Sequence, residues 1–375
     1  MTAVTFLLMA LALILSRPRM HSRPLMGEPW LSRERTSFVN GFFICMVIFS
    51  HLGKFGCYYP DERRLIVLLI PGQLIVTTFF FYSGYGIMYS ILKKREAYVK
   101  SLLTRRFPQL LLNFGIAVLI YVIAQHFLGQ DYSCSHILMS LIGWEKAGNS
   151  NWFICMTLLA YLLIFLSFTV CGARRPYWAI ALTAAVMLTS LYIIGQFKES
   201  YWVSTYLCIP AGMLFAVRKE HVEKYLSKVP YSAIGLGILM IVCGCVLYSL
   251  LYSPPHILHG LLQLPYNLRL FLANIGSIMF AGGLTYVYSC ISFRKLSPVM
   301  VWLGGAALFP VYIFHLMPMI IGHHFKWDTC HPQFYIAGCL IASLLLAVLF
   351  QRIYSILGKL LFPGFPLSAP GKPAR

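Results

Sequence analysis

Long runs of apolar residues, separated by short polar stretches, recur along the whole 375-residue chain. Most are close to the about 20 residues that an α-helix needs to cross about 30 Å of hydrocarbon. The pattern predicts ten membrane-spanning helices, at residues 37–57, 69–92, 108–129, 152–171, 177–195, 201–217, 231–253, 269–292, 299–322 and 335–358. Glycine or proline inside runs 69–92 and 299–322 favours kinks or local unwinding there.

A shorter apolar stretch, residues 5–16, precedes these runs. It resembles the apolar region of a signal peptide, but it lacks the preceding positive charge and the following small-residue cleavage site. We therefore expect a short interfacial helix, with a full span as the alternative. The chain then divides into this helix with a basic cytosolic segment (1–36), a membrane domain (37–360) and a cytosolic tail (361–375).

The composition agrees with the pattern. Hydrophobic residues make up 59% of the chain and charged residues only 11%, against about 25% in an average soluble domain. A soluble protein could not cover so much apolar surface, so we expect an all-α, polytopic membrane protein. The net charge of +19 raises the question of nucleic acid. The chain has no RNA-binding motif, however, and basic cytosolic loops account for the charge.

The distribution of basic residues sets the expected orientation. With the start of run 37–57 in the cytosol, 23 Lys and Arg residues fall on the cytosolic side and seven outside. The positive-inside rule predicts such an asymmetry, and a missed span would scramble it. The same orientation puts the C-terminus in the cytosol.

All eleven acidic residues lie outside the ten predicted spans. Proton- and sodium-coupled carriers usually need a carboxylate at membrane depth, so the pattern disfavours them. A general base within the spans must therefore be a histidine or, failing that, a tyrosine or cysteine. His51 and His315 both lie well inside predicted spans and are functional candidates. The alternative for each is a neutral imidazole that hydrogen-bonds neighbouring helices.

Two further groups of polar residues flank His51. Asn40 lies eleven residues earlier, close to a whole number of helical turns, so the two share a helix face, and Lys54 extends this stripe outward. On the cytosolic side, segment 93–107 carries six basic residues, including Arg105 and Arg106. Membrane orientation and phosphate binding explain these charges equally well.

Three short motifs place polar groups at helix ends or bends. FFFYSGYGI (79–87) contains Ser83 and Tyr85, GNSNWFICMTLLAYLL (148–163) contains Asn151, and FPVYIFHLMPM (309–319) sets His315 between prolines. The cysteines form no CxxC pair. Three of them fall in predicted outer loops, where a disulfide can form: Cys57, Cys134 and Cys330.

Taken in order, NGFFICMVIFSH, FFFYSGYGI, TRRFPQLLL, NWFICMTLLAYLL and FPVYIFHLMP resemble the acyltransferase-3 family of bacterial membrane O-acyltransferases. The resemblance covers about residues 37–358. It implies an enzyme of the bacterial inner membrane that moves an acyl group, usually acetyl, from cytosolic acyl-CoA to a glycan hydroxyl at the outer side. It implies no tightly bound cofactor and no metal.

The family's first-helix motif is a basic residue, ten intervening residues and a histidine. His51 matches the histidine, whereas Asn40 stands where the family usually has arginine. The family also has two arginines before a proline at the start of the third helix. Arg105 and Arg106 precede Pro108 here, although the usual spacing between the two arginines is not reproduced. The resemblance assigns Arg105, Arg106 and Asn40 to the acyl-CoA site.

These observations predict that His51 is the general base, which takes the proton of a sugar hydroxyl as that hydroxyl attacks the thioester. An acyl-histidine intermediate is the variant mechanism. The oxyanion that develops needs donors or support, and the candidates are Lys54, Ser83, Tyr85, Asn151 and His315. The expected partners are acyl-CoA, a glycan or lipid-linked saccharide acceptor, and membrane lipids.

Three other functions stay open from the sequence. A carrier or flippase for lipid-linked glycan would use the basic residues to bind pyrophosphate and would not consume acetyl-CoA. A haem-binding electron carrier would use His51 and His315 as axial ligands. A structural membrane protein without activity is the third alternative.

Overall fold

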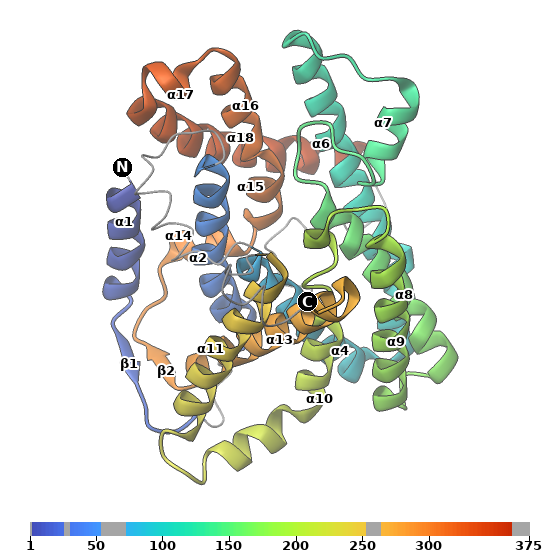
Figure 1. Cartoon of the computed structure of the whole chain (residues 1–375), viewed down its shortest axis with the longest axis vertical. Coiled ribbons are helices and arrows are strands. Elements are labelled where there is room, and N and C mark those ends of the chain that lie inside the picture. The colour runs from blue at the N-terminus through green and yellow to red at the C-terminus, as the bar shows by residue number, and fades with distance from the viewer. Residues whose placement is uncertain (1, 26–30, 54–72, 253–263, 362–375) are drawn as a thin grey trace.

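The computed structural model describes residues 2–25, 31–53, 73–252 and 264–361. These residues form a bundle of helices with a small two-stranded sheet (Figure 1). In chain order the elements are α1 (Thr2–Leu15), β1 (Pro18–Met20), α2 (Arg33–Leu52), α4 (Leu74–Lys94), α5 (Glu96–Ser101), α6 (Phe107–Phe127), α7 (Cys134–Leu141), α8 (Trp152–Cys171), α9 (Pro176–Ile194), α10 (Cys208–Leu226), α11 (Ser232–Tyr252), α13 (Tyr266–Ser289), β2 (Ile291–Phe293), α14 (Pro298–Gly304), α15 (Leu308–Phe314), α16 (Leu316–His324), α17 (Trp327–Cys330) and α18 (Pro332–Leu361). A π-helical turn, Leu102–Arg106, joins α5 to α6.

Eight helices in the described ranges are long and apolar enough to cross a membrane: α2, α4, α5 continued into α6, α8, α9, α11, α13 and α18. The helices α14 and α15–α16 add a ninth if they count as one span, although the chain bends by 67° between them. The protein is therefore an all-α, multi-pass membrane protein, as the sequence predicts. The predicted count of ten spans is not confirmed.

The predicted span at 201–217 takes another form. Residues 203–207 make consecutive turns, and α10 begins only at Cys208. Asn274 of α13 holds these turns, because its amide donates to the carbonyl of Val203 and its Oδ1 accepts the N–H of Leu207. α10 then continues through the charged sequence RKEHVEK, which shortens its apolar part.

The two runs with internal glycine or proline behave differently. Run 299–322 breaks after Gly304, where α14 crosses α2 so closely that a Cβ on Gly304 would lie 1.9 Å from the carbonyl oxygen of Ser37. The break redirects the chain, so that α15 leads to the end of α2. Run 69–92 shows no break from Leu74 to Lys94. Gly84 instead allows close packing on α10, where a Cβ would lie 2.0 Å from the carbonyl oxygen of Ile209.

The N-terminal stretch forms a helix, as expected. α1 has 14 residues and is therefore about 21 Å long, short of the about 30 Å of a hydrocarbon core. The strand that follows, β1, pairs antiparallel with β2 in the register Pro18↔Phe293 to Met20↔Ile291. A side-chain hydrogen bond between His21 Nε2 and Ser292 Oγ, 2.7 Å long, adds to this contact.

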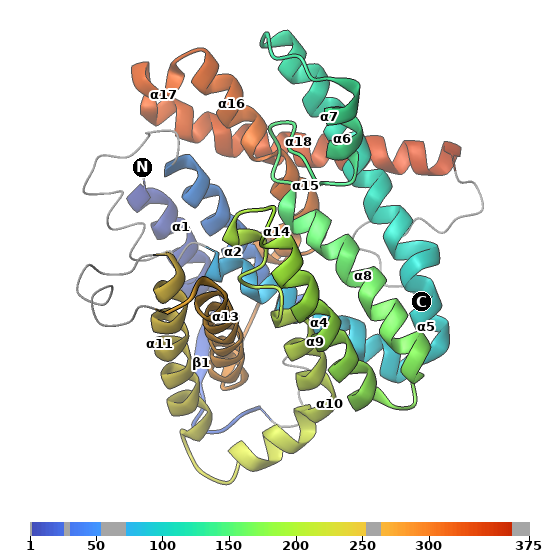
Figure 2. The same cartoon turned by 45° about the vertical axis from the view of Figure 1, so that its right-hand side comes forward.

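The last long helix, α18, crosses the upper half of the molecule in Figures 1 and 2 and packs against α15 and α16. Tyr335 of α18 donates its hydroxyl proton to the carbonyl of Met319 in α16 over 2.9 Å. The predicted cytosolic tail, 361–375, lies outside the described residues apart from Leu361.

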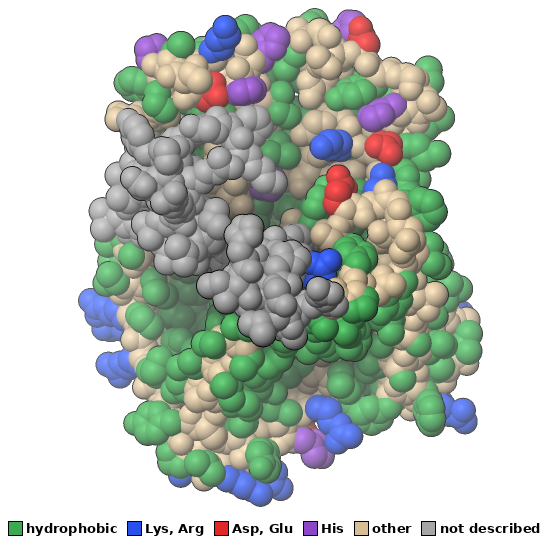
Figure 3. Space-filling view, viewed as in Figure 1, with side chains coloured by type: hydrophobic (Ala, Val, Ile, Leu, Met, Phe, Trp, Pro, Cys, Tyr) green, Lys and Arg blue, Asp and Glu red, His purple; other side chains and the backbone are tan. Residues whose placement is uncertain are grey.

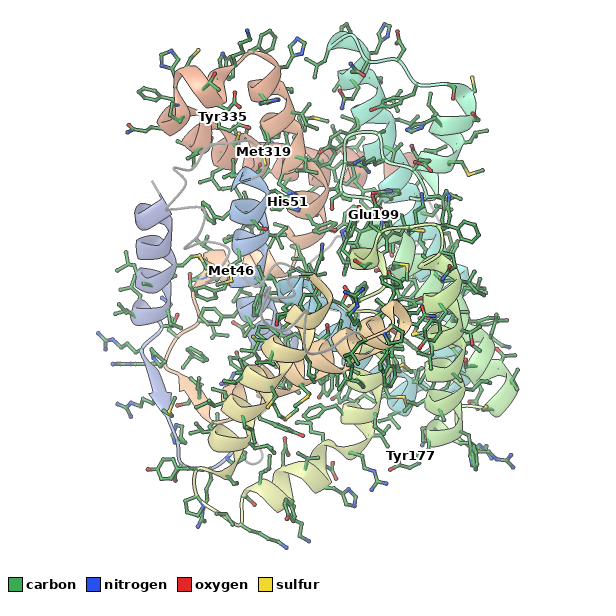
Figure 4. The ribbon with its side chains drawn as sticks, in the orientation of Figure 1. Met46, His51, Tyr177, Glu199, Met319 and Tyr335 are labelled. Carbon is green, nitrogen blue, oxygen red and sulfur yellow. The ribbon has the colours of Figure 1, made fainter. Side chains whose placement is uncertain are left out.

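Charged side chains are divided between the two ends of the bundle. In Figure 3, Lys and Arg are most frequent in the lower half, whereas the visible Asp and Glu side chains lie in the upper half. A broad hydrophobic belt separates them. Figure 4 places Tyr177, at the start of α9, near the lower end and Glu199, just after α9, in the upper half. The lower end is therefore the one that the positive-inside rule assigns to the cytosol.

Candidate active site

Two histidines from distant parts of the sequence meet in the upper half of the bundle. His51 lies in the last turn of α2, and His315 lies at the junction of α15 and α16. Their ring centres are 4.9 Å apart, and the rings are inclined by 59°. His315 is completely buried and His51 is half-buried, and Figure 4 shows His51 on the side of α2 that faces α15. The structure thus joins two of the sequence candidates.

The main chain of α15 fixes the ring of His315. Its Nδ1 lies 2.7 Å from the carbonyl oxygen of Tyr312 and 3.3 Å from that of Val311. A carbonyl oxygen only accepts hydrogen bonds, so Nδ1 is the donor. The ring of Tyr312 itself lies 6.0 Å from that of His315, centre to centre.

Tyr312 connects the pair to the loop before α8. The hydroxyl of Ser150 donates to the Tyr312 hydroxyl oxygen over 2.9 Å. The neighbouring residue, Asn151, donates its amide protons to the carbonyls of Gly143 and Glu145, at 2.8 and 3.0 Å. Asn151 therefore holds the loop that carries Ser150, and both its N–H groups are engaged there rather than directed at an oxyanion.

Two of the remaining candidates for oxyanion support, Ser83 and Tyr85, lie on α4. Lys54 falls outside the described residues. Ser83 is exposed on α4. Tyr85 packs toward α10, with its ring centre 6.1 Å from that of Tyr89 and 6.2 Å from that of Phe215. The motif FFFYSGYGI therefore serves the packing of α4 on α10 in the described structure.

Asn40 lies on α2 below the histidine pair. Its side chain is half-buried, and its Oδ1 is buried without a hydrogen-bond partner among the described residues. A buried acceptor without a partner is unusual in a folded protein.

Arg105 and Arg106 differ in their surroundings. Arg105 is exposed. Arg106 places its guanidinium 5.3 Å from the centre of the Tyr98 ring and lines a pocket of about 200 Å³ between α6, α8, α15 and α18. The pocket therefore has a cation at the end that the charge distribution assigns to the cytosol.

The pocket beyond Arg106 is partly polar. Its hydrogen-bonding groups come from Gln109, Asn113, Tyr161, Gln351 and Tyr354, and Phe309, Pro310 and Phe350 supply apolar walls. Asn113 Oδ1 and the Tyr354 hydroxyl are buried without well-aligned hydrogen-bond partners among the described residues. Phe309 and Pro310 belong to α15, the helix that ends at His315, so one helix borders the pocket and leads to the histidine pair.

A known protein family matches the part of the chain that contains the histidine pair and most of the pocket. The acyltransferase-3 family, described as an acyltransferase domain, matches residues 38–352. The chain belongs to the acyltransferase-3 family. The match begins in α2 before His51 and ends in α18 after Gln351, so it includes the histidine pair and most of the pocket. No curated protein and no solved structure matches the chain significantly.

The sequence did not indicate several residues of this acyltransferase-3 site. Gln109 and Asn113 are four residues apart in the apolar run of α6, so helical spacing alone puts them on one face. Ser150 and Tyr312 gave no such signal, because their hydrogen bond joins residues 162 positions apart.

The geometry also bears on the haem alternative. Two axial histidines bind iron from opposite faces of a porphyrin at about 2 Å each, which keeps their ring centres roughly 6 Å apart or more. The 4.9 Å between His51 and His315 leaves no room for a porphyrin between the rings of this acyltransferase-3 protein. Within the described ranges, no group of three or more His, Cys, Asp or Glu could hold a metal ion.

The cysteines predicted to lie outside are not paired with each other in the described structure. Cys134 and Cys330 are exposed free thiols, and Cys57 lies outside the described residues.

Proposed function

We propose that this acyltransferase-3 protein transfers an acetyl group from cytosolic acetyl-CoA to a hydroxyl of a cell-surface or lipid-linked glycan. Transfer takes place at the outer side of the bacterial inner membrane, with His51 as the general base. Succinyl or a longer acyl group is the alternative donor group. The observation that carries the proposal is the buried contact between His51 and His315 within a chain of this family.

The chemistry assigned to His51 needs few groups. A neutral imidazole accepts the proton of the sugar hydroxyl while the hydroxyl oxygen attacks the thioester carbonyl carbon. The new C–O bond forms, the C–S bond breaks, and the sulfur leaves with the bonding electrons and takes the proton from His51.

The pocket beside Arg106 supports the proposed donor. Acyl-CoA carries phosphate groups, which arginine binds well, and a pantetheine arm with two amides. Arg106 stands at the cytosolic end of the pocket, and amide and hydroxyl side chains follow it inward. We assign the phosphates to Arg105 and Arg106 and the arm to the pocket, with Asn40 as a further polar contact.

The position of the histidines supports an acceptor that arrives from the opposite side. His51 lies in the last turn of α2, near the upper end, and the Ser150 loop adjoins the pair from that end. Acyl-CoA that enters from the lower end and a glycan that arrives from the upper end then meet at His51. The inner-membrane location and the cytosolic C-terminus belong to this proposal.

A carrier or flippase for lipid-linked glycan is the alternative function. Such a protein needs charged groups along a path through the membrane. The acidic side chains of the upper end pair with basic partners near the surface, in His126–Asp131, Lys198–Glu145 and His323–Asp328. Consumption of acetyl-CoA by the purified protein separates the two functions.

The direct test replaces His51 with alanine and, separately, with glutamine. Both variants should lose about 10²- to 10⁴-fold in acetyl transfer from acetyl-CoA to purified cell-surface glycan, since both remove the base. His126→Ala is the matched control, because His126 is exposed and pairs with Asp131. Wild-type rates in a well-folded His51→Ala protein would contradict the proposal.

A further inference from the structure

A general base needs its tautomer fixed, and carboxylates usually do this for histidine. Three of the described acidic side chains at the upper end pair with basic partners, and Glu199 is exposed at the surface. The group that does face His51 is the ring of His315, which is wholly buried.

The contact of His315 with the main chain determines its protonation pattern. Nδ1 lies 2.7 Å from the carbonyl oxygen of Tyr312 and must carry a proton to make that hydrogen bond. A neutral imidazole has one N–H and one unprotonated nitrogen, so Nε2 of a neutral His315 holds a lone pair. The backbone of α15 therefore makes His315 an acceptor on its far side.

We propose that His315 is a positioning residue for His51, in the role that a carboxylate has in other general-base sites. Its Nε2 accepts a hydrogen bond from one ring N–H of His51, which leaves the other His51 nitrogen unprotonated and directed at the acceptor hydroxyl. In the described structure Nε2 of His315 is buried and does not make this bond. The ring centres are 4.9 Å apart, so that a small rotation of the His51 ring completes a hydrogen bond of about 3 Å. This inference rests on the proposed function.

In this relay, by which we mean the hydrogen-bonded pair of His51 and His315, His315 gains no proton over the reaction. When His51 takes the hydroxyl proton it becomes a cation, and its other N–H, held by His315 Nε2, shares that charge. The Nδ1–H of His315 remains on the Tyr312 carbonyl throughout. The proton then goes from His51 to the departing thiolate, and both rings return to their starting state.

Replacing His315 with asparagine or with glutamine distinguishes the positioning role from a role in packing. An asparagine amide occupies the place of Nδ1, so it can keep the hydrogen bond to the Tyr312 carbonyl but presents nothing to His51. A glutamine amide reaches the place of Nε2, so it can offer an acceptor oxygen to His51. Both side chains are close in size to histidine. If His315 only packs or anchors α15, the asparagine variant should be the more active of the two, or the two variants should be equally active.

The experiment measures kcat and KM with acetyl-CoA and purified cell-surface glycan for His315→Gln, His315→Asn, Tyr312→Phe and His51→Ala. Thermal unfolding in detergent shows which proteins are folded. We expect kcat of His315→Asn to fall about 10²-fold, with the KM for acetyl-CoA unchanged, and His315→Gln to keep at least tenfold more activity than His315→Asn. Tyr312→Phe, which keeps the carbonyl, should retain more activity than His315→Asn.

Equal activity of the folded His315→Gln and His315→Asn proteins, with His51→Ala inactive, would overturn the relay and leave the proposed function standing. So would a Tyr312→Phe protein as impaired as His315→Asn, because the phenol would then be the group that the site needs. A fully active His51→Ala protein would instead remove the proposed function itself.

Discussion

Arg105 and Arg106 are adjacent in sequence and carry the same charge, yet only one of them lines the pocket. Both side chains are exposed, but only the guanidinium of Arg106 lies over Tyr98 and lines the pocket together with Tyr161. A planar guanidinium packed on an aromatic ring is preorganised for phosphate, because less side-chain freedom is lost on binding. The sequence alone treats the two arginines as a pair; the structure distinguishes them.

Arg106→Ala should therefore raise the KM for acetyl-CoA more than Arg105→Ala does. A hydrogen bond to a charged group contributes about 1.5–3 kcal/mol, so we expect a rise of about 10- to 100-fold for Arg106→Ala and about threefold or less for Arg105→Ala. Arg106→Lys should fall between wild type and alanine. Initial rates over a range of acetyl-CoA concentrations give these values.

Lys100→Ala serves as the control for this comparison, because Lys100 is a basic residue exposed on α5. Its KM should match that of the wild type. An equal rise in KM for all three alanine variants would show a general electrostatic attraction instead of a phosphate contact at Arg106.

At the scale of single elements, the break between α14 and α15 determines where His315 goes. α14 rests on α2 at Gly304, without space for a side chain, and the chain then turns by 67° toward the end of α2. The catalytic proposal for His51 and His315 thus depends on a helix crossing about halfway down α2. A shift of α14 would move α15, and with it the ring that faces His51.

Gly304→Ala should lower both stability and activity. Its Cβ would meet the Ser37 carbonyl at 1.9 Å, and backbone on both sides cannot move aside cheaply. Overpacking of this kind costs about 1–3 kcal/mol, so the thermal midpoint in detergent should fall by several degrees. The activity of the folded fraction should fall as well, since α15 is displaced.

Gly338→Ala is the matched control on α18. Its Cβ would have nothing within 4 Å, and alanine favours a helix over glycine by about 0.5–1 kcal/mol. This variant should be as stable as the wild type or more so. Equal losses in the two variants would show that the α2–α14 crossing does not limit stability.

For the molecule as a whole, hydrophobic pattern predicts well what depends on local sequence. It predicts the helices and the membrane class, because an apolar run is visible within 20 residues, and it singles out His51 as a candidate because a histidine inside such a run is visible too. It missed the turn at 203–207, which depends on Asn274 of another helix. It also missed the partnership of His51 with His315, because the path of α15 follows from a close contact at Gly304 that no local pattern records.

Several candidates from the sequence have other contacts in the described structure. The glycines beside Ser83 and Tyr85 predict a kink or a close backbone approach, and the structure has the close approach, of α4 to α10. Asn151 was chosen for its place at a helix start and instead holds a loop. Short polar motifs indicate that a helix has a close neighbour, and they do not say which one.

The orientation of the whole molecule can be tested with its own thiols. Cys134 and Cys330 are exposed and free, on α7 and α17 at the upper end in Figure 1. A membrane-impermeant maleimide should label them in intact spheroplasts. In a protein with Cys57, Cys134 and Cys330 replaced by serine, this labelling should disappear, and an added Lys100→Cys should react only after the membrane is permeabilised. Labelling of Lys100→Cys in intact spheroplasts would reverse the orientation.

The pairing of β1 with β2 has a consequence for biosynthesis. His21 and its partner Ser292 are 271 residues apart, so at about 5–20 residues per second the ribosome needs roughly 15–55 s to supply the second strand. Through that interval the first strand waits at the membrane surface with its edge exposed, a state in which strands pair with wrong partners. The pairing of β1 with β2 can therefore hold the amino-terminal helix in place only after the helices from α2 to α13 have been made, which makes this ribbon a late step in assembly.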